Sequence, residues 1–236
     1  MMDRQAELKS HLETVMTRIQ TACAQVGRAA SDVTCLAVSK TKPIEDIDCL
    51  RAAGQTAFGE NYVQEAVEKI TTLADPSLSW HFIGAIQSNK TQLIAQHFDW
   101  VHTVDRAKIA HRLQDARTGA PLNVLIQVNI DQSASKAGVL PDALPALVDE
   151  VLQCSNLRLR GLMSIPDPVD ETALKQAHRD LKVLFEQTKT RLSSSESFDT
   201  LSMGMTHDLE WAIAEGSTLV RIGTALFGKR EPKEAT

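Results

Sequence analysis

The chain contains few residues of the kinds that mark special classes of protein. Its 236 residues include four cysteines, Cys23, Cys35, Cys49 and Cys154, which form no C-x-x-C pair and accompany no cluster of histidines. This pattern predicts neither a structural zinc site nor a disulfide framework. We therefore expect reduced thiols and no metal site.

Long apolar runs and dense basic runs are also missing. No stretch approaches the roughly eighteen uninterrupted apolar residues of a membrane-spanning helix, and residues 1–5 lack the apolar core of a secretory signal. Aromatic residues are scarce, basic residues are scattered and the net charge is −5, so no nucleic-acid-binding surface is indicated. These absences favour a cytoplasmic protein that binds neither membranes nor nucleic acids.

What the chain does contain is a regular alternation of short apolar runs with helical patterns. An amphipathic helical pattern over residues 3–26 comes first. The apolar runs that follow, interpreted as strands, are 33–39, 56–59, 80–84, 100–103, 123–129, 157–163, 200–202 and 219–222. The helical patterns between them are 43–53, 63–72, 90–97, 106–117, 142–153, 172–192 and 208–215.

Strict alternation of strand and helix predicts a parallel sheet with crossover helices, and eight such strands predict an α/β fold closed into a (β/α)8 TIM barrel. An open doubly wound sheet is the alternative. No linker or low-complexity segment divides the chain. We therefore expect one domain over residues 1–236, with an additional N-terminal helix at 3–26 and a disordered or frayed tail at 229–236.

Functional residues of such a barrel lie at the carboxyl ends of its strands. The first strand ends in Lys40, which shares parity with Leu36 and Val38 and should therefore emerge from a packed interior. A second ammonium on Lys42 would lower the pKa of Lys40, making it a nucleophile that holds a carbonyl cofactor as an imine. The alternative is that both lysines are solvated residues of a strand-to-helix turn.

The loops after the last two strands suit a phosphate. Ser202, Met203 and Gly204 end the seventh run, and Gly223 and Thr224 follow the eighth. The glycines lack the Cβ atoms that would block an approach to backbone N–H groups, and Ser202 and Thr224 add hydroxyl donors. A simple requirement of the turn would explain either glycine equally well.

Arg221 shares parity with Leu219, so it is predicted to lie at the rim of the barrel interior. One interpretation pairs it with a carboxylate such as Glu60 in a structural ion pair. The other places it against the ring nitrogen of a pyridine cofactor. Because guanidinium only donates hydrogen bonds, it would keep that nitrogen unprotonated and so limit carbanion chemistry.

Blocks of sequence spread over essentially the whole chain occur in the order of a known family. They are AVSKTKP at 37–43, FGENYVQE at 58–65, HFIG at 81–84, QSNK at 87–90, GLMSIP at 161–166, LSMGM at 201–205 and VRIGT at 220–224. Together they closely resemble the pyridoxal phosphate homeostasis protein family. One departure is Thr206, where serine commonly follows the Met-Gly-Met run, and the hydroxyl is retained.

The resemblance implies a barrel like the N-terminal domain of alanine racemase, with pyridoxal 5'-phosphate held as a Schiff base on Lys40. It implies Arg221 as the partner of the pyridine nitrogen and Asn61 near the phenolic oxygen. It places the phosphate on Ser202, Gly223 and Thr224, with Met203 and Gly204 in the same loop. The family is thought to buffer or deliver the cofactor and to affect amino-acid and keto-acid metabolism, without an established catalytic turnover.

A non-catalytic carrier is therefore expected, with a racemase or lyase of weak activity as the alternative. A two-base racemase needs a second proton-transfer group, which related racemases supply as a tyrosine from an additional β domain. The tyrosine of this chain, Tyr62, adjoins the second strand, and the chain ends soon after the eighth. An open mouth suits exchange of the cofactor more than protected carbanion chemistry.

The expected partners are pyridoxal phosphate and the apo-enzymes that accept it, and the chain is expected to be a monomer or weak dimer. An apo barrel used as an interaction module is disfavoured by the many polar strand ends. Lys136, on the loop after the fifth strand, either contacts cofactor in transit or is a solvated loop residue.

Overall fold

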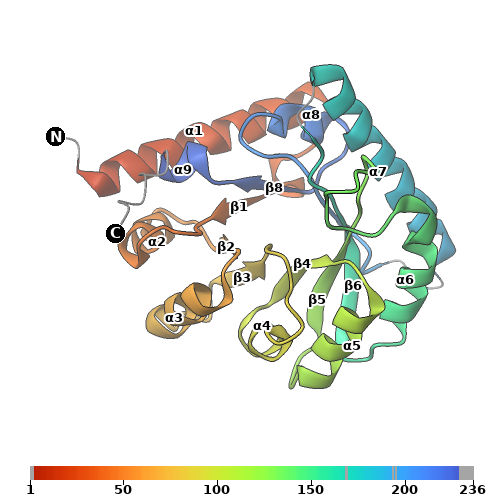
Figure 1. Ribbon diagram of the computed structural model, residues 1–236. Helices are drawn as coiled ribbons and strands as arrows, with labels where there is room; N and C mark the ends of the chain where they lie inside the picture. Colours follow the sequence, from red (N-terminus) through yellow and green to blue (C-terminus); the bar gives the residue numbers. More distant parts are fainter. Residues whose placement is uncertain (1–2, 168–169, 193, 195, 229–236) are drawn as a thin grey trace.

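The computed structural model describes residues 3–167, 170–192, 194 and 196–228. Within them, eight strands form a closed barrel in which each strand pairs in parallel with the next and the eighth pairs with the first (Figure 1). The strands are β1 (Thr34–Val38), β2 (Ala57–Glu60), β3 (Ser79–Phe82), β4 (Trp100–Val104), β5 (Leu122–Gln127), β6 (Leu157–Met163), β7 (Thr200–Ser202) and β8 (Leu219–Ile222). The predicted (β/α)8 barrel is confirmed.

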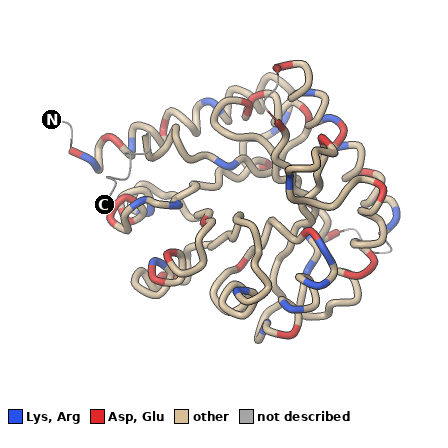
Figure 2. The backbone as a smooth tube through the Cα atoms, viewed as in Figure 1, with Lys and Arg blue, Asp and Glu red and all other residues tan. Residues whose placement is uncertain are grey.

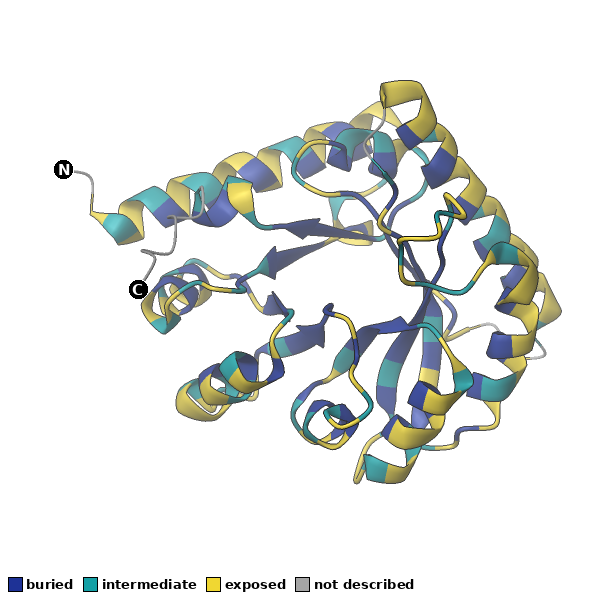
Figure 3. Cartoon of the chain, in the orientation of Figure 1, coloured by how far each residue is buried: buried dark blue, intermediate teal, exposed yellow. Residues whose placement is uncertain are grey.

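Helices surround the barrel and cover its strands (Figure 3). They are α1 (Arg4–Gln25), α2 (Ile44–Ala52), α3 (Val63–Leu73), α4 (Thr91–His97), α5 (Ala107–Ala116), α6 (Leu144–Leu152), α7 (Glu171–Arg191), α8 (Leu209–Ala214) and α9 (Thr224–Phe227). The longest crossover helix, α7, begins where Asp170 accepts a hydrogen bond from the backbone N–H of Ala173 at 2.8 Å. None of the described helices has the length and apolar character needed to cross a bilayer.

Most element boundaries lie within one or two residues of the sequence-based expectation, and three differences concern the region of α6, the end of β4 and α9. The pattern at 142–153 is divided into a 3-10 turn (Pro141–Ala143) and α6, because the prolines at 141 and 145 have no N–H to donate and fit only the first turn of a helix. Strand β4 extends to Val104, which moves His102 from the rim into the barrel. Helix α9 was not predicted, since four residues are too few to show a helical period. The predicted tail at 229–236 lies outside the described residues.

The strands bury both faces, and the two faces differ in chemistry. Outward-facing residues such as Ala37, Phe58 and Val124 join one large apolar cluster with the helices. A small separate cluster lies on the inner face and consists of Leu36, Ala57, Ile83 and Leu219. The rest of the inner face includes the buried polar side chains of His81, His102, Ser202 and Arg221. The barrel interior therefore combines a small apolar cluster with buried polar groups, which cost free energy unless they are hydrogen-bonded.

Helix α1 crosses the outside of the barrel next to α2, α8 and α9 (Figure 1). Arg4 pairs with Asp46 of α2 at 2.6 Å, and Arg18 pairs with Glu210 of α8 at 2.8 Å. The ring of His11 contacts the carbonyl oxygen of Leu226 at 2.8 Å. Acidic and basic residues are scattered over the surrounding helices (Figure 2).

Candidate functional site

Lys40 lies where the sequence predicts, immediately after β1 at the carboxyl end of the barrel. Leu36, two strand positions below Val38, is fully buried in the inner cluster, so the inner face of β1 leads from an apolar interior to Lys40. Lys40 is half-buried and opens a turn in which Thr41 has a φ of 62°. A threonine in this left-handed region is uncommon, so the surrounding contacts must hold the turn.

The turn is held by a charged network that sequence reasoning missed. Thr41 donates its backbone N–H to Glu65 Oε1 at 2.6 Å, and Lys69 Nζ donates to the same oxygen at 2.6 Å. Lys69 Nζ also donates to Glu60 Oε1 at 2.8 Å and to the Ser39 carbonyl oxygen at 2.9 Å. Helix α3 thus fixes both the residue before Lys40 and the residue after it. The i, i+4 spacing of Glu65 and Lys69 on a helix could have predicted their ion pair, but not the contacts of Lys69 with Glu60 and Ser39.

Glu60 is the buried anion of the network. Its side chain is 0% exposed, and it accepts a hydrogen bond from Ser39 Oγ at 2.6 Å as well as that from Lys69. Burial raises the pKa of Glu60, and the charge and hydrogen bond of Lys69 oppose that rise. The alternative in which Arg221 pairs with Glu60 is wrong, because Glu60 lies on the outer face of β2 under α3.

Arg221 is buried in the barrel beneath the carboxyl ends of the strands. Its Nη1 donates to Ser202 Oγ at 2.7 Å, and its Nη2 donates to the carbonyl oxygen of Ser164 at 2.8 Å. Burial lowers its pKa to about 10, although the charge of Asp208 opposes this, so the guanidinium stays positive at neutral pH. Among the described residues, Arg221 forms no ion pair with a carboxylate. A buried cation of this kind favours a ligand that brings acceptors or negative charge.

The loop after β7 is the more tightly built of the two predicted phosphate loops. Gly204 has a φ of +92°, and a Cβ there would lie 2.5 Å from the Cβ of Ala212. Asp208 Oδ1 accepts the backbone N–H of Met205 at 2.7 Å, and His178 Nε2 lies 2.8 Å from Asp208 Oδ2. Burial alone would raise the pKa of Asp208, but these hydrogen bonds lower it. The loop is therefore fixed from beneath by a buried His–Asp pair.

The other predicted residues of these loops differ in what they can offer. Ser202 and Met203 are fully buried, the first toward Arg221 and the second in the outer apolar cluster. Gly223 has room for a Cβ, and Thr224 is exposed at the start of α9. The structure thus brings these loops to one end of the barrel, while their contact with a phosphate stays a prediction.

Two buried polar atoms without a hydrogen-bond partner lie at this end of the barrel. In the described part of the chain, the buried side-chain atoms with no hydrogen bond are Glu60 Oε2, Asn61 Oδ1, Ser164 Oγ and His178 Nδ1. Asn61 and Ser164 directly follow β2 and β6, at the same end as Lys40. Since buried polar groups are normally satisfied, Asn61 Oδ1 and Ser164 Oγ fit a site completed by a polar ligand.

The remaining candidate lysines are held by the chain itself. Lys42 Nζ donates to the carbonyl oxygen of Phe227 at 3.3 Å. Lys136 Nζ contacts Asp131 at 2.8 Å and Asp167 at 2.9 Å, and also donates to the Ile165 carbonyl oxygen at 2.7 Å. Lys136 therefore joins the loops after β5 and β6, which is more than a solvated loop lysine does. Among the described residues, no group of three or more His, Cys, Asp or Glu side chains is placed to hold a metal ion.

Comparisons with known proteins show which family the chain matches. The family model for the alanine racemase N-terminal domain matches residues 12–231. The pyridoxal phosphate homeostasis protein of Pasteurella multocida is 52% identical over 95% of this chain and 98% of its own length. The protein of the same name from Pseudomonas aeruginosa is 51% identical over 95% and 96% of the two chains.

Solved structures support the fold. An unknown protein from Bifidobacterium adolescentis superposes with a TM-score of 0.87 at 32% identity, covering 96% of this chain and 98% of that one. PipY of Synechococcus elongatus, solved with PLP bound, gives a TM-score of 0.72 at 36% identity, covering 89% and 100%. Alanine racemase from E. faecalis shares the fold with a TM-score of 0.70 at 15% identity, over 97% of this chain and 59% of that one. The chain belongs to the pyridoxal phosphate homeostasis protein family, and it has the alanine racemase N-terminal type of domain.

Proposed function

We propose that this protein binds pyridoxal 5'-phosphate reversibly, as a Schiff base with Lys40, and serves in the cytoplasm as a carrier or buffer of the cofactor. The names of its relatives and the PLP bound in PipY support binding. Through this role it would contribute to vitamin B6 and amino-acid or keto-acid homeostasis, with cofactor-accepting apo-enzymes as its partners.

The observation that carries the proposal is the presence of Lys40 and of the buried Arg221 at the same end of the barrel. The amine of Lys40 would condense with the aldehyde of the cofactor, forming a C=N bond and releasing water. Arg221 has a buried positive charge with no carboxylate partner among the described residues, and it suits the ring nitrogen because it only donates. Asn61, with an unpartnered side-chain oxygen, would lie near the phenolic oxygen of the cofactor.

The phosphate would be held by the two loops that meet beside Arg221. Gly204 and Met203 would offer backbone groups, as would Gly223, while the exposed hydroxyl of Thr224 would donate directly. The Ser202 hydroxyl is already engaged by Arg221, so its contribution would pass through that arginine or through its own backbone. The His178–Asp208 pair keeps the first loop in place.

A carrier is favoured over a racemase by the place of the tyrosine. Tyr62 is 53% exposed at the start of α3, where its ring is not held in a water-excluding pocket that could position a second base. A group in such a place cannot hold a proton at a fixed atom of the substrate. The exposed position of Tyr62 therefore supports reversible binding and exchange.

Titration of the purified protein with pyridoxal phosphate tests the proposal. A visible imine absorbance should form with wild type and with the control Lys175→Ala, whose lysine is an exposed residue of the outer helix α7. It should be lost in Lys40→Ala. Failure of wild type to form the band refutes binding. A transfer assay to an apo-enzyme, compared with free cofactor at equal concentration, tests delivery separately, because no acceleration or protection would leave binding intact and remove the carrier role.

A further inference from the structure

A chain of hydrogen-bonded side chains crosses the barrel interior and ends on Arg221. Arg221 Nη1 donates to Ser202 Oγ at 2.7 Å, and Ser202 Oγ lies 3.1 Å from His102 Nδ1. His102 Nε2 lies 2.9 Å from His81 Nδ1, and His81 Nε2 lies 3.0 Å from Ser79 Oγ. These residues come from β3, β4, β7 and β8, so the chain links opposite sides of the barrel.

Arg221 determines the direction of the chain because it can only donate. Ser202 Oγ accepts from Arg221, which leaves the hydroxyl proton of Ser202 to be placed. Among the described hydrogen bonds of this hydroxyl, His102 Nδ1 is the acceptor within reach. His102 must then carry its proton on Nε2 and donate it to His81 Nδ1. By the same step, His81 carries its proton on Nε2 and donates it to Ser79 Oγ.

The reverse arrangement is less favourable. If His102 donated from Nδ1 to Ser202, the buried Ser202 hydroxyl would hold a proton with no acceptor among the described residues. An unmade hydrogen bond of a buried hydroxyl is costly. The Nε2–H form of both histidines is therefore the one that satisfies every group in the chain.

Both imidazoles are neutral and their rings are fixed. Burial lowers the pKa of His81 to about 3 and that of His102 well below its usual range, the latter helped by His81 and the positive charge of Arg221. The His81 ring stacks on Trp100 with centroids 5.2 Å apart and planes 4° apart. The Trp100 ring in turn lies 4.6 Å from the guanidinium carbon of Arg160.

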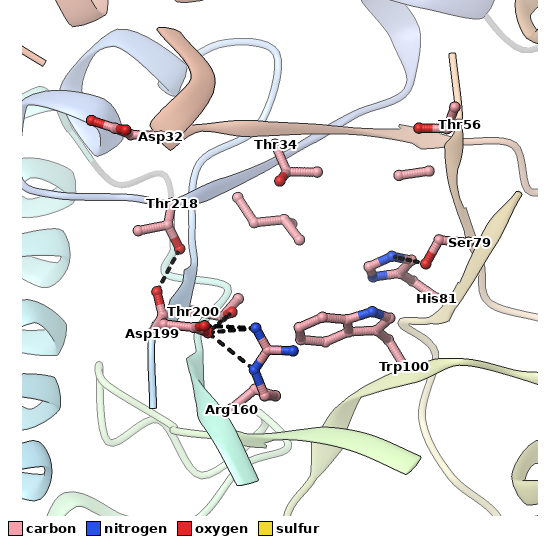
Figure 4. A pocket seen from close by; sticks show the side chains of 12 residues that line it. Asp32, Thr34, Thr56, Ser79, His81, Trp100, Arg160, Asp199, Thr200 and Thr218 are labelled. Atoms are coloured by element: carbon pink, nitrogen blue, oxygen red, sulfur yellow. Dashed lines mark hydrogen bonds and ion pairs between the residues drawn. The ribbon is translucent and has the colours of Figure 1, made fainter. Parts of the chain in front are cut away.

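The end of the hydrogen-bond chain that lies away from Arg221 opens into a pocket at the amino ends of the strands (Figure 4). This pocket has a volume of ≈ 560 Å³, and Ser79, His81 and Trp100 line it together with Arg160 and several threonines. Ser79 Oγ accepts from His81, so its own proton can be directed to water in the pocket. Every donor of the hydrogen-bond chain can therefore find an acceptor, with Arg221 as the donor at one end and solvent as the acceptor at the other.

We propose that His102, acting through Ser202, and His81 behind it are positioning residues that hold the Arg221 guanidinium in the orientation required by the cofactor ring. The inference rests on the proposed cofactor role of Arg221. His102 keeps the Ser202 hydroxyl turned away from Arg221, so that the lone pairs of Ser202 face the guanidinium. Ser164 fixes the second nitrogen, and the plane of the guanidinium is thereby set by two acceptors.

Nitrogen-15 NMR of the cofactor-free protein tests the hydrogen-bond chain without relying on cofactor binding. His81 and His102, assigned among the seven histidines by His81→Gln and His102→Asn, should both show the neutral Nε2–H form from about pH 5 to 8. Protonation of either ring in that range, or a proton on Nδ1, overturns the proposal. This outcome is independent of whether the protein binds pyridoxal phosphate.

Cofactor affinity of matched variants tests the positioning role. His102→Leu removes the acceptor for Ser202 and should weaken affinity about tenfold, roughly the value of one well-placed hydrogen bond, and shift the visible band of the bound cofactor. His102→Asn places an amide oxygen near the position of Nδ1 and should stay within about twofold of wild type. Leu125→Val, a change at a buried residue of the neighbouring strand β5, should leave affinity and spectrum unchanged.

Equal effects of His102→Leu and His102→Asn would contradict the role of the acceptor, and so would a His102→Leu variant with wild-type affinity and spectrum. His81→Leu breaks the chain one step farther from Arg221 and serves as the second variant if His102→Leu does not fold. It should weaken affinity by about threefold. If wild type binds no cofactor, the proposed function fails while the NMR result still stands.

Discussion

Removing Lys69 should destabilise the protein strongly, although the residue lies on a helix outside the barrel. Lys69 is buried and forms hydrogen-bonded ion pairs with Glu60 at 2.8 Å and Glu65 at 2.6 Å. In Lys69→Met the carboxylate of Glu60, which is 0% exposed, would lose its counter-charge. Breaking a buried pair from one side costs about 3–5 kcal/mol, which for a chain of this size lowers the Tm by roughly 6–20 °C.

The pH dependence gives this prediction a second signature. The pKa of Glu60 is already raised by burial, and without Lys69 it should rise further. A carboxyl with a raised folded-state pKa binds its proton more tightly in the folded protein than in the unfolded one. The deficit of Lys69→Met relative to wild type should therefore shrink as the pH falls through the folded-state pKa of Glu60.

Urea unfolding followed by tryptophan fluorescence measures the effect. Lys175→Met is the matched control, since its pair with Glu171 is on the surface and should contribute at most about 1 kcal/mol. Lys69→Met with Glu60→Gln should recover part of the loss, because glutamine can still accept from Ser39 without a charge. A loss below about 1 kcal/mol in Lys69→Met, or no recovery in the double variant, would refute the role assigned to this ion pair.

Further predictions concern the barrel and its mouth. Gly161→Ala should cost roughly 2–6 kcal/mol of unfolding free energy, measured with urea. Gly161 has a φ of +153°, and a Cβ at this position would lie 1.8 Å from the Thr200 carbonyl oxygen. The control Gly119→Ala, with a φ of +82° and open space around it, should cost only about 1 kcal/mol. Equal losses would contradict the close approach of β6 to β7. The unfolding free energy should fall as the pH decreases from about 6.5 toward 3. In this range the lowered pKa values keep His81 and His102 neutral in the folded protein, whereas the same two rings bind protons in the unfolded chain. The slope should be smaller in His81→Gln, and an unchanged slope in that variant would argue against a buried neutral His81.

The sequence predicted the elements well where one periodic pattern extended over many residues. Strands β6, β7 and β8 have the predicted bounds, and α1 and α7 differ from them by a residue at either end. The α9 helix and the division at Pro141 were missed, because short turns depend on local geometry that a period of 3.6 does not report. The expectation of one domain over residues 1–236 stays a prediction.

The candidate site was predicted where it depends on the alternation of residues along a strand. Parity along β1 and β8 placed Lys40 and Arg221, since alternate residues of a strand share a face. The polar interior was not foreseen. His102 reaches Ser202 across 100 positions of sequence, and in a strand buried on both faces a histidine gives no sign of which face it occupies. The alternative that paired Arg221 with Glu60 was wrong for a similar reason, because the partner of Glu60 depends on which face of β2 meets α3.

The central claim is that Lys40 is the residue that holds the cofactor, and mapping of the attachment site tests it most directly. The protein would be incubated with pyridoxal phosphate, reduced with borohydride, digested and analysed by mass spectrometry. The label should be found on the peptide containing Lys40, and Lys40→Ala should carry none at Lys42 or Lys136 under the same conditions. A wild-type protein without label, or a label of equal yield on another lysine in Lys40→Ala, would contradict the claim.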